Sequence, residues 1–409
     1  MAIKKECVFT YHIIQDRERK NLAILELIRK KGPISKAEIS RILGYNIVTI
    51  TNYLDYYIDK RMILQVGLDV SSGGRRPELL ELNAKSGYVV GVDMGPESIT
   101  AVVTDLKVNE VAKTRIARPS GSMEDLIPEV IKVIEDTTKK NKVSSDIIRN
   151  IGIGVSGIVD YPSGTIHDTD PTRGRTKVSF VKFVSAIEQN YNVSVCIGND
   201  ASCAAFGEKT LNLGADVDNL LYIYSDVGCG IVVHGDVYIG SSGCAGETQL
   251  AFNGLQKDEK NYAKEYTYLR PWGVDLGVVF EAKKAIEKGV STEILKLIKG
   301  DPKLITKEVV IEAAKKNDKL AVELIENAGR DLGTRIAYLV NLFNPAVVII
   351  GGGMERAGDI LLDPVKAAVK KFSFEEPSST VKIIPSLLGE DAIVLGVAAL
   401  AVREVFVQV

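Results

Sequence analysis

The sequence predicts an α/β protein that begins with a winged helix-turn-helix. Two observations carry this prediction. The first is a pair of short helices, joined by a glycine turn and followed by a hairpin, before residue 85. The second is a change, from Tyr88 onward, to short β-branched runs that alternate with longer helices, a pattern typical of buried strands in an α/β sheet. Because 409 residues are too many for one core, we expect separate domains over residues 1–85 and 86–409.

The helix pair is predicted from its start and stop signals. Ser35 can cap the free N–H groups of a helix over residues 36–43, and Glu38, three residues later, can complete a capping box. Gly44 permits the left-handed turn that ends this helix, and Asn46 can cap the next one. The second helix is therefore the expected DNA-reading helix.

The outward side chains of this helix are small, polar or aromatic, the types that reach base edges and phosphates from the major groove. The predicted DNA contacts of the helix pair are Ser35, Asn46, Thr49, Thr51, Asn52 and Tyr53. The side chains expected to face the domain interior are Ile47, Ile50, Leu54 and Ile58.

A wing is predicted next. Strand-like residues 63–66 and 78–82 flank a glycine-rich tip, residues 71–77. Arg75 and Arg76 at this slim tip suit insertion into a narrow minor groove, where the negative potential is strongest. The alternative is an ordinary solvated hairpin whose charges are there by chance.

Charge and cysteine usage limit the class of protein. Residues 1–85 hold 15 Lys and Arg against 10 Asp and Glu, whereas the remainder holds 36 against 43, so the basic part is the part expected to contact DNA. The five cysteines are irregularly spaced, which favours reduced thiols in a cytoplasmic protein. No signal peptide is expected in residues 1–15, and the longest apolar run, residues 392–402, is too short to span a membrane.

The larger part repeats one pattern of strands and helices, so two lobes of similar construction are expected. A long helix over residues 320–343 is predicted to end at Asn344-Pro345, before a strand and the Gly351-Gly352-Gly353 turn. The other predicted strands are residues 88–93, 99–105, 151–155, 193–197, 220–224 and 231–234, with a helix over 123–140.

These motifs resemble the ROK family (repressors, open reading frames and sugar kinases). The matching segments are residues 91–95, 152–160, 198–208, 240–247 and 344–353. The resemblance implies a two-lobed, actin-like (ribonuclease H-like) sugar kinase fold, with lobes over residues 86–197 plus the C-terminal helix and 198–385. With the winged helix in front, nearly the whole chain resembles the xylose- and N-acetylglucosamine-responsive repressor branch.

The resemblance implies that Gly157, Asn199, Asp200 and Glu247 bind a sugar. A carboxylate beside a carboxamide can accept from and donate to two adjacent hydroxyls, so the Asn199-Asp200 pair suits this role even without phosphoryl transfer. The alternative for Asp200 is a residue that only caps the following helix.

Phosphate binding is expected to be lost. The family's kinases have Asp-x-Gly-Gly-Thr where this chain has residues 93–97; Pro96 removes a backbone donor there, and Glu97 adds a charge of the wrong sign. A second loop, residues 224–226, carries Asp226 where the family usually has Gly-Thr-Gly. We therefore expect no cofactor and no kinase activity, with Asp200 as a vestigial base.

Zinc binding is not expected either. The family commonly has Glu-Ile-Gly-His followed by a cysteine cluster, but this chain has Glu247-Thr248-Gln249-Leu250, and residues 251–275 contain neither Cys nor His.

The sequence thus predicts a sugar-responsive, DNA-binding transcriptional repressor whose partners are operator DNA, a sugar effector and a second copy, as homodimer or tetramer, and not a membrane. Two alternatives stay open. One is an active sugar kinase with an appended DNA-binding domain. The other is a ligand-independent regulator that keeps a kinase-like body for dimerisation.

Overall fold

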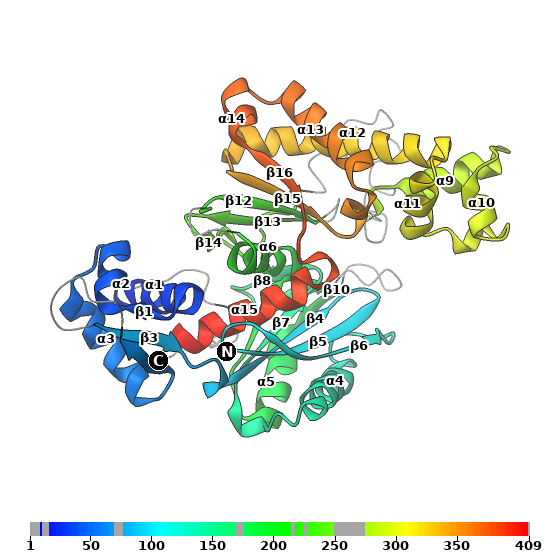
Figure 1. The fold of residues 1–409 in the computed structure, drawn as a ribbon. Helices are drawn as coiled ribbons and strands as arrows, with labels where there is room; N and C mark the ends of the chain where they lie inside the picture. The colour runs from blue at the N-terminus through cyan, green and yellow to red at the C-terminus, as the bar shows by residue number, and fades with distance from the viewer. Residues whose placement is uncertain are drawn as a thin grey trace. The chain divides into compact units, whose positions relative to one another are not determined.

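The structure, a computed structural model, describes residues 9, 16–68, 77–168, 176–213, 217–224, 228–248 and 275–407. The chain divides into two compact units (Figure 1). Unit 1 contains residues 1–166, 177–199 and 394–409, and unit 2 contains residues 167–176 and 200–393. The winged helix and the first α/β sheet therefore belong to the same unit.

The winged helix consists of three helices and a three-stranded sheet. Its helices are α1 (Asp16–Lys31), α2 (Lys36–Leu43) and α3 (Ile47–Asp59). Its strands are β1 (Ile34–Ser35), β2 (Ile63–Leu68) and β3 (Glu78–Leu82), paired antiparallel in the order β1-β3-β2. Ile28 of α1, Ile50 of α3 and Leu80 of the central strand β3 are fully buried. One apolar core therefore holds the helices and the sheet together.

The helix boundaries confirm the predicted capping. The Ser35 hydroxyl accepts a hydrogen bond from Glu38 N (3.3 Å), and Asn46 Oδ1 accepts one from Val48 N (2.8 Å). Gly44 has φ 70°, a left-handed conformation that glycine adopts without strain.

One predicted orientation in α3 is wrong. Ile47 was expected to face the interior, but its side chain is 48% exposed, whereas Ile50 and Leu54 are buried as predicted. Tyr57 fills the third inward position. The first residue of a helix precedes the packed turns, so helical spacing alone does not bring it into the core.

Unit 1 continues as a five-stranded sheet in the order β11-β7-β4-β5-β6. Strands β4 (Tyr88–Met94), β7 (Ile148–Val155) and β11 (Val195–Asn199) are parallel to one another; β5 (Ser98–Asp105) and β6 (Glu110–Ala117) extend the sheet as antiparallel strands. Three short strands, β8 (Ile158–Asp160), β9 (Thr165–Asp168) and β10 (Thr176–Ser179), follow β7.

Helices cover both faces of this sheet, as Figure 1 shows. Helices α4 (Ile127–Lys140) and α5 (Phe180–Tyr191) share a core with Val90 and Val92 of β4. Gly91 lies between these two valines and therefore faces the opposite side, where α15 (Ala392–Val407) packs.

Unit 2 contains a second five-stranded sheet in the order β14-β13-β12-β15-β16. Its strands are β12 (Leu220–Tyr224), β13 (Gly228–Val233), β14 (Asp236–Val237), β15 (Val347–Gly351) and β16 (Lys382–Pro385). Its helices are α6 (Asp200–Leu211), α9 (Val278–Glu287), α10 (Glu293–Leu297), α11 (Lys307–Lys315), α12 (Lys319–Phe343), α13 (Asp359–Phe372) and α14 (Glu375–Thr380). Asn344 ends α12 with φ 44°, which confirms the predicted stop. Among the described residues, no helix has both the length and the apolar character needed to cross a bilayer.

Candidate DNA-binding and sugar-binding sites

The exposed side of α3 carries the predicted contact residues. Asn46 and Asn52 are exposed, and Thr49, Thr51 and Tyr53 are partly exposed. The buried residues Ile50, Leu54 and Tyr57 occupy the other side of the helix. The sequence therefore divides α3 into a packed side and a polar side that is open to a ligand.

Ser35 is a correction. Its side chain is only 3% exposed, and its hydroxyl is engaged at the start of α2. Because the side chain is buried by the domain that it caps, it is not presented to DNA, and Ser35 contributes to the site only by fixing α2.

The structure adds three residues that the sequence reasoning missed. Arg17 of α1 lines a hollow of about 300 Å³ together with Thr49, Asn52 and Tyr53 of α3. Ile47 and Val48, 48% and 65% exposed, stand at the N-terminal end of α3, the end that contacts bases in helix-turn-helix proteins. Apolar side chains there can contact thymine methyl groups. The sequence signal that could have identified Ile47 and Val48 as contacts is two aliphatic residues directly after the Asn46 cap.

The wing can be followed only in part. Strands β2 and β3 pair from Ile63–Leu82 to Leu68–Glu78, and Gln65 Nε2 donates to Glu78 Oε2 (2.8 Å) across them. The tip with Arg75 and Arg76 lies outside the described residues.

Two of the predicted sugar residues belong to unit 1. Asn199 is the last residue of β11, and its Nδ2 donates to the carbonyl of Gly157 (3.1 Å). Gly157 follows β7 with φ 121°, a region that favours glycine. Since β7 and β11 are parallel neighbours, their carboxyl ends bring these two residues together at one edge of the sheet.

The other two belong to unit 2. Asp200 is the first residue of α6; it is 3% exposed, and its Oδ1 accepts from Ala201 N (2.7 Å). This bond is local to the first turn of α6, and Asp200 follows Asn199 directly in the chain. Glu247 is exposed and follows Gly246, whose carbonyl accepts from Cys229 N (2.9 Å).

In the first phosphate loop, residues 93–97, backbone carbonyls accept hydrogen bonds from an arginine. Arg118 Nη1 donates to Gly95 O (3.1 Å) and lies 3.5 Å from Met94 O, while Arg118 N donates to Glu97 O (2.9 Å). The backbone that follows β4 is therefore held from within the same unit. The second loop, with Ser225 and Asp226, lies outside the described residues.

The glycine turn after β15 is also hydrogen-bonded to side chains of unit 2. Gly353 N donates to Glu355 Oε2 (2.7 Å), and Lys307 Nζ donates to Gly352 O (2.8 Å). Burial raises the pKa of the Glu355 carboxyl, and the bonds from the turn and the Lys307 charge oppose this shift.

The residues of the family's zinc segment do not fit a zinc ion. Glu247-Thr248 are described, and the rest of the segment, residues 249–274, lies outside the described residues. The side-chain chemistry of the segment decides the fit: residues 251–275 contain neither Cys nor His, so they supply neither thiolate nor imidazole, the ligands of structural zinc.

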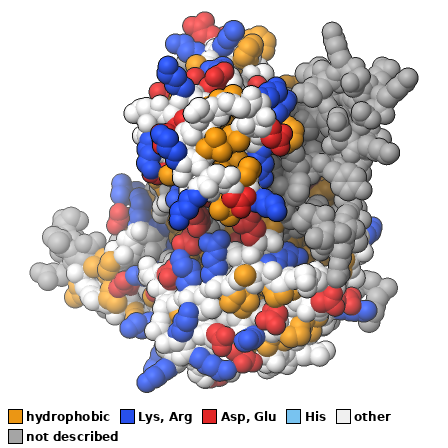
Figure 2. Space-filling view, turned by 90° about the vertical axis from the view of Figure 1, so that its right-hand side faces the viewer, with side chains coloured by type: hydrophobic (Ala, Val, Ile, Leu, Met, Phe, Trp, Pro, Cys, Tyr) orange, Lys and Arg blue, Asp and Glu red, His pale blue; other side chains and the backbone are white. Residues whose placement is uncertain are grey.

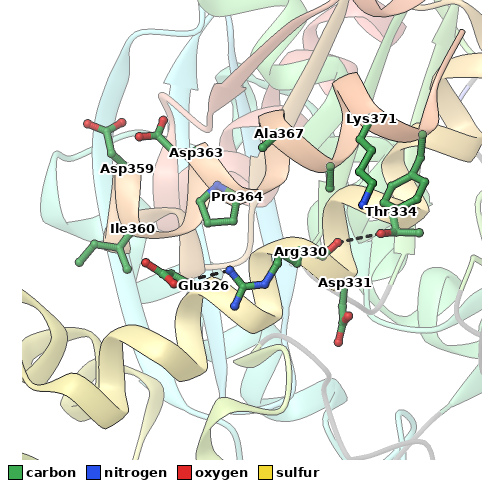
Figure 3. A pocket seen from close by; sticks show the side chains of 12 residues that line it. Glu326, Arg330, Asp331, Thr334, Asp359, Ile360, Asp363, Pro364, Ala367 and Lys371 are labelled. Atoms are coloured by element: carbon green, nitrogen blue, oxygen red, sulfur yellow. Dashed lines mark hydrogen bonds and ion pairs between the residues drawn. The ribbon is translucent and has the colours of Figure 1, made fainter.

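A groove of about 830 Å³ lies between α12 and α13 (Figure 3). Arg330 faces Glu326 across 3.5 Å on α12, and Asp359 and Asp363 project from α13. None of the predicted sugar residues lines this groove, so it is a separate feature of unit 2.

A capped helix pair with a β-hairpin, followed by two α/β sheets, is the architecture of a DNA-binding regulator built on a kinase-like body. The model of the ROK family matches residues 89–255 and 280–404. The chain belongs to the ROK family.

Relatives of the same length carry repressor names. The xylose repressor of Caldicellulosiruptor bescii is 29% identical, covering 94% of this chain and 95% of that protein. The xylose repressor of Bacillus subtilis is 28% identical over 93% and 94%. The N-acetylglucosamine repressor of Escherichia coli O157:H7 is 24% identical over 91% and 89%.

Solved structures show the fold. A ROK family transcriptional regulator, described as a homologue of the E. coli MLC protein, superposes with a TM-score of 0.78 at 24% identity, covering 96% of this chain and 97% of that one. A ROK family glucokinase from Streptomyces griseus, with glucose and AMPPNP, superposes with a TM-score of 0.60 at 24% identity, covering 77% and 99%. The part of the chain that follows the winged helix thus has the actin-like fold of the ROK sugar kinases.

Proposed function

We propose that the protein is a sugar-responsive transcriptional repressor that binds operator DNA through α3 and the wing. The observation that supports this most directly is the capped α2–α3 pair, whose polar side is exposed while Ile50 and Leu54 anchor the other side. Because its buried side is packed on the rest of the domain, the helix can present its polar side to the major groove. The repressor names of full-length relatives support the same role.

Asn46, Thr49, Thr51, Asn52 and Tyr53 are the proposed contacts of α3, and Arg75 and Arg76 those of the wing. Arg17 is added as a phosphate contact because it lines the same hollow as Thr49 and Asn52. On the face drawn in Figure 2, basic and acidic side chains are interspersed among the coloured atoms, a mixture that does not suit a polyanion. The basic excess of residues 1–85 is therefore assigned to DNA.

The effector is proposed to be a monosaccharide bound by Gly157, Asn199, Asp200 and Glu247. The carboxamide of Asn199 is oriented by its bond to Gly157 O, and Asp200 adds a carboxylate next to it in the chain. Such a pair can donate to and accept from neighbouring ring hydroxyls.

Phosphoryl transfer is not part of the proposed function. In the first loop Pro96 has no N–H to offer, and Arg118 donates to the carbonyl of Gly95. In the glycine turn the Gly353 N–H already serves Glu355, whose carboxylate would repel a phosphate. Of the backbone donors at these two turns, the one at position 96 is thus absent and the one at Gly353 is engaged, which weakens a nucleotide cradle.

We further propose that residues 1–85 and 86–409 act as DNA-binding and effector domains of a cytoplasmic homodimer, or of a tetramer built from two such dimers. A two-fold axis would present two α3 helices to a palindromic operator.

The test begins with DNA that the full-length protein selects from a random duplex library. Fluorescence anisotropy then gives the operator Kd with and without D-xylose, N-acetyl-D-glucosamine or D-glucose, and a thermal shift reports sugar binding independently. A sugar at 100 times its Kd should stabilise the protein by roughly 2.7 kcal/mol. The expected result is a selected palindrome whose affinity changes with one sugar.

Failure to enrich any sequence would contradict the DNA-binding role. A selected operator whose affinity no sugar alters, together with no thermal shift, would favour the ligand-independent regulator.

A further inference from the structure

The C-terminal end of α15 is held by side chains of α1 and α3. The Tyr57 hydroxyl of α3 donates to the carbonyl of Phe406 (3.4 Å), and Asn21 Nδ2 of α1 lies 3.5 Å from the same oxygen. Asn21 Nδ2 also donates to the Tyr57 hydroxyl (2.5 Å). Tyr57 is 2% exposed and Phe406 fully buried, so this contact joins the interior of the winged helix to the last turn of α15.

This contact meets a known need of helix ends. The last four carbonyls of a helix have no partner within it, and a buried carbonyl without a donor destabilises the fold. Burial raises the pKa of the Tyr57 hydroxyl, so it stays protonated and remains a donor at neutral pH. A hollow of about 280 Å³, lined by Arg17, Asn52 and Val407 among others, lies beside the contact and leaves space around the helix end.

The other end of α15 is fixed on the sheet of unit 1. A Cβ atom added to Gly91 would lie 2.6 Å from Val394 O, and one added to Gly152 would lie 2.8 Å from Val397 Cγ1. Gly91 and Gly152 are paired directly across β4 and β7, so together they form the seat on which α15 rests. At 1.5 Å per residue, α15 rises about 18 Å from Val394 on this seat to Phe406 at α3.

The seat is close in sequence to the proposed sugar residues. From Gly152, β7 continues to its last residue, Val155, and leads into the turn of Gly157, whose carbonyl accepts from Asn199. An unbroken path of packed or bonded groups therefore runs from Asn199 through β7 and α15 to Tyr57. Figure 1 shows α15 lying along the sheet toward α1 and α3.

The winged helix has a second attachment to the same sheet. Arg29 of α1 donates to the carbonyl of Lys107 (3.4 Å), which follows β5, and Lys107 Nζ pairs with Glu81 of β3 (2.6 Å). With the domain held there, a displacement of the α15 end would turn α3 about this attachment rather than carry the domain along with α15.

We propose that Asn21 and Tyr57 are positioning residues, which fix the reading helix on the C-terminal end of α15 and transmit occupancy of the sugar site to the operator. The inference rests on the proposed function, because it names the route by which that sugar site controls DNA binding. Its regulatory element is α15, whose two ends contact the sheet and α3.

The experiment uses full-length Tyr57→Phe and Asn21→Ala. The matched control is Tyr191→Phe, which also removes a hydroxyl that donates to a backbone carbonyl, that of Ile131 (3.1 Å), in the same unit but far from α3 in sequence. For each protein the ratio of operator Kd with and without the active sugar is measured, and a thermal shift confirms that the sugar still binds. The ratio should move toward one by about two- to tenfold in both test variants, since one hydrogen bond is worth a factor of this size, and should be unchanged in Tyr191→Phe.

Hydrogen–deuterium exchange of the same proteins gives a readout that does not need a sugar. Amides of α3 and of the last turn of α15 should exchange faster in Tyr57→Phe and Asn21→Ala than in the wild type and Tyr191→Phe. Melting curves identify any variant that fails to fold, and the partly exposed Asn21 provides the milder substitution.

The outcomes separate the two proposals. The route through α15 is overturned if a sugar changes the operator Kd of the wild type and the ratio of operator Kd with and without that sugar is the same in both test variants as in the wild type. The proposed function is then left intact. If no sugar changes the operator Kd of the wild type, the effector role is contradicted. Hydrogen–deuterium exchange then tests the positioning role, and unchanged protection of the α3 amides in both test variants overturns it.

Discussion

Asp200, a proposed sugar-binding residue, also makes a local hydrogen bond at the start of α6. One oxygen accepts from Ala201 N (2.7 Å), but a carboxylate has about four lone-pair sites, so this bond does not exhaust its capacity to accept. Its position directly after Asn199 keeps it at the sheet edge where Asn199 contacts Gly157. Asp200 is therefore the single residue whose charge should matter most for sugar binding.

Replacing Asp200 by Asn keeps the shape of the side chain and an oxygen that can accept from Ala201 N, but it removes the charge. The sugar Kd should weaken by the equivalent of roughly 1.5 to 3 kcal/mol, the worth of a hydrogen bond to a charged group. Isothermal titration with the sugar found by thermal shift measures this change. Asp236→Asn is the matched control, since Asp236 Oδ1 likewise accepts from the next residue, Val237 N (3.0 Å). Equal affinity in Asp200→Asn and Asp236→Asn would remove Asp200 from the sugar site.

Local signals at single residues could be predicted from the sequence, whereas burial could be predicted only in part: Ile50 and Leu54 are buried as predicted, and two other assignments are wrong. Asn46 and Gly44 behave as predicted because capping depends on neighbours a few positions away. Ile47, one residue after Asn46, was assigned to the interior and is exposed, and Ser35 was assigned to DNA and is buried. Ile47 precedes the packed turns of α3, and Ser35 pairs with Leu79 of β3, a distant contact that the local sequence does not record.

At the scale of elements, α12 depends on a cap that also serves a second helix. Asp318 accepts from Ala321 N (2.9 Å) at the start of α12 and from Glu293 N (2.8 Å) at the start of α10, and it also accepts from the Thr292 hydroxyl (2.9 Å). Burial acts to raise the pKa of Asp318, but these bonds outweigh it and lower the pKa below its ordinary value of 3.8.

Asp318→Ala should therefore destabilise unit 2 by roughly 1 to 2 kcal/mol, the worth of a lost N-cap. A depressed folded-state pKa stabilises the protein above the unfolded value, so the deficit should be complete at pH 7 and shrink as the pH falls below about 3.8. Urea unfolding at pH 7, 5 and 3.5 measures it. Asp331→Ala, an exposed position of the same helix, is the control; a deficit as large there would show that the cap is not the cause.

The wing is the element whose role rests on sequence alone. Replacing Arg75 and Arg76 by Ala should weaken operator binding and reduce the slope of log K against log salt by up to roughly two, because fewer counterions are released. Anisotropy titrations at several salt concentrations measure both. Lys139→Ala/Lys140→Ala at the end of α4 makes the same change of charge outside the winged helix. If the two double variants gave the same slope, the wing would not contact DNA.

Element prediction succeeded where the pattern was long. The helix expected over residues 320–343 is α12, Lys319–Phe343, and the strand expected over 88–93 is β4, Tyr88–Met94. The helix expected from residue 123 begins at Ile127, because residues 123–126 form a turn before it. The two-residue strand β1 was not predicted, since its pairing with β3 depends on a segment more than 40 residues away.

At the scale of the whole molecule, contacts from distant segments hold the turn after β4 and the turn after β15. Arg118, the residue after β6, donates to the loop after β4, and Lys307 of α11 donates to the turn after β15. The sequence indicated the loss of phosphate binding through Pro96 and Glu97, and it suggested an intact turn at Gly351-Gly352-Gly353. The engagement of that turn by Glu355 becomes visible only in the folded unit.

These contacts lead to a prediction for the full-length protein. With ATP, magnesium and the sugar that stabilises it, the protein should form no sugar phosphate above the background set by Asp200→Asn, and AMPPNP should give no thermal shift. The physical reason is that the two described phosphate turns offer carbonyls and a carboxylate that are already bonded internally, and these repel rather than hold an anion. The Streptomyces griseus glucokinase, which was crystallised with glucose and AMPPNP, is the positive control for both measurements. Sugar phosphate that accumulates with the wild type and disappears with Asp200→Asn would make this chain a kinase, with its winged helix as an added regulatory domain.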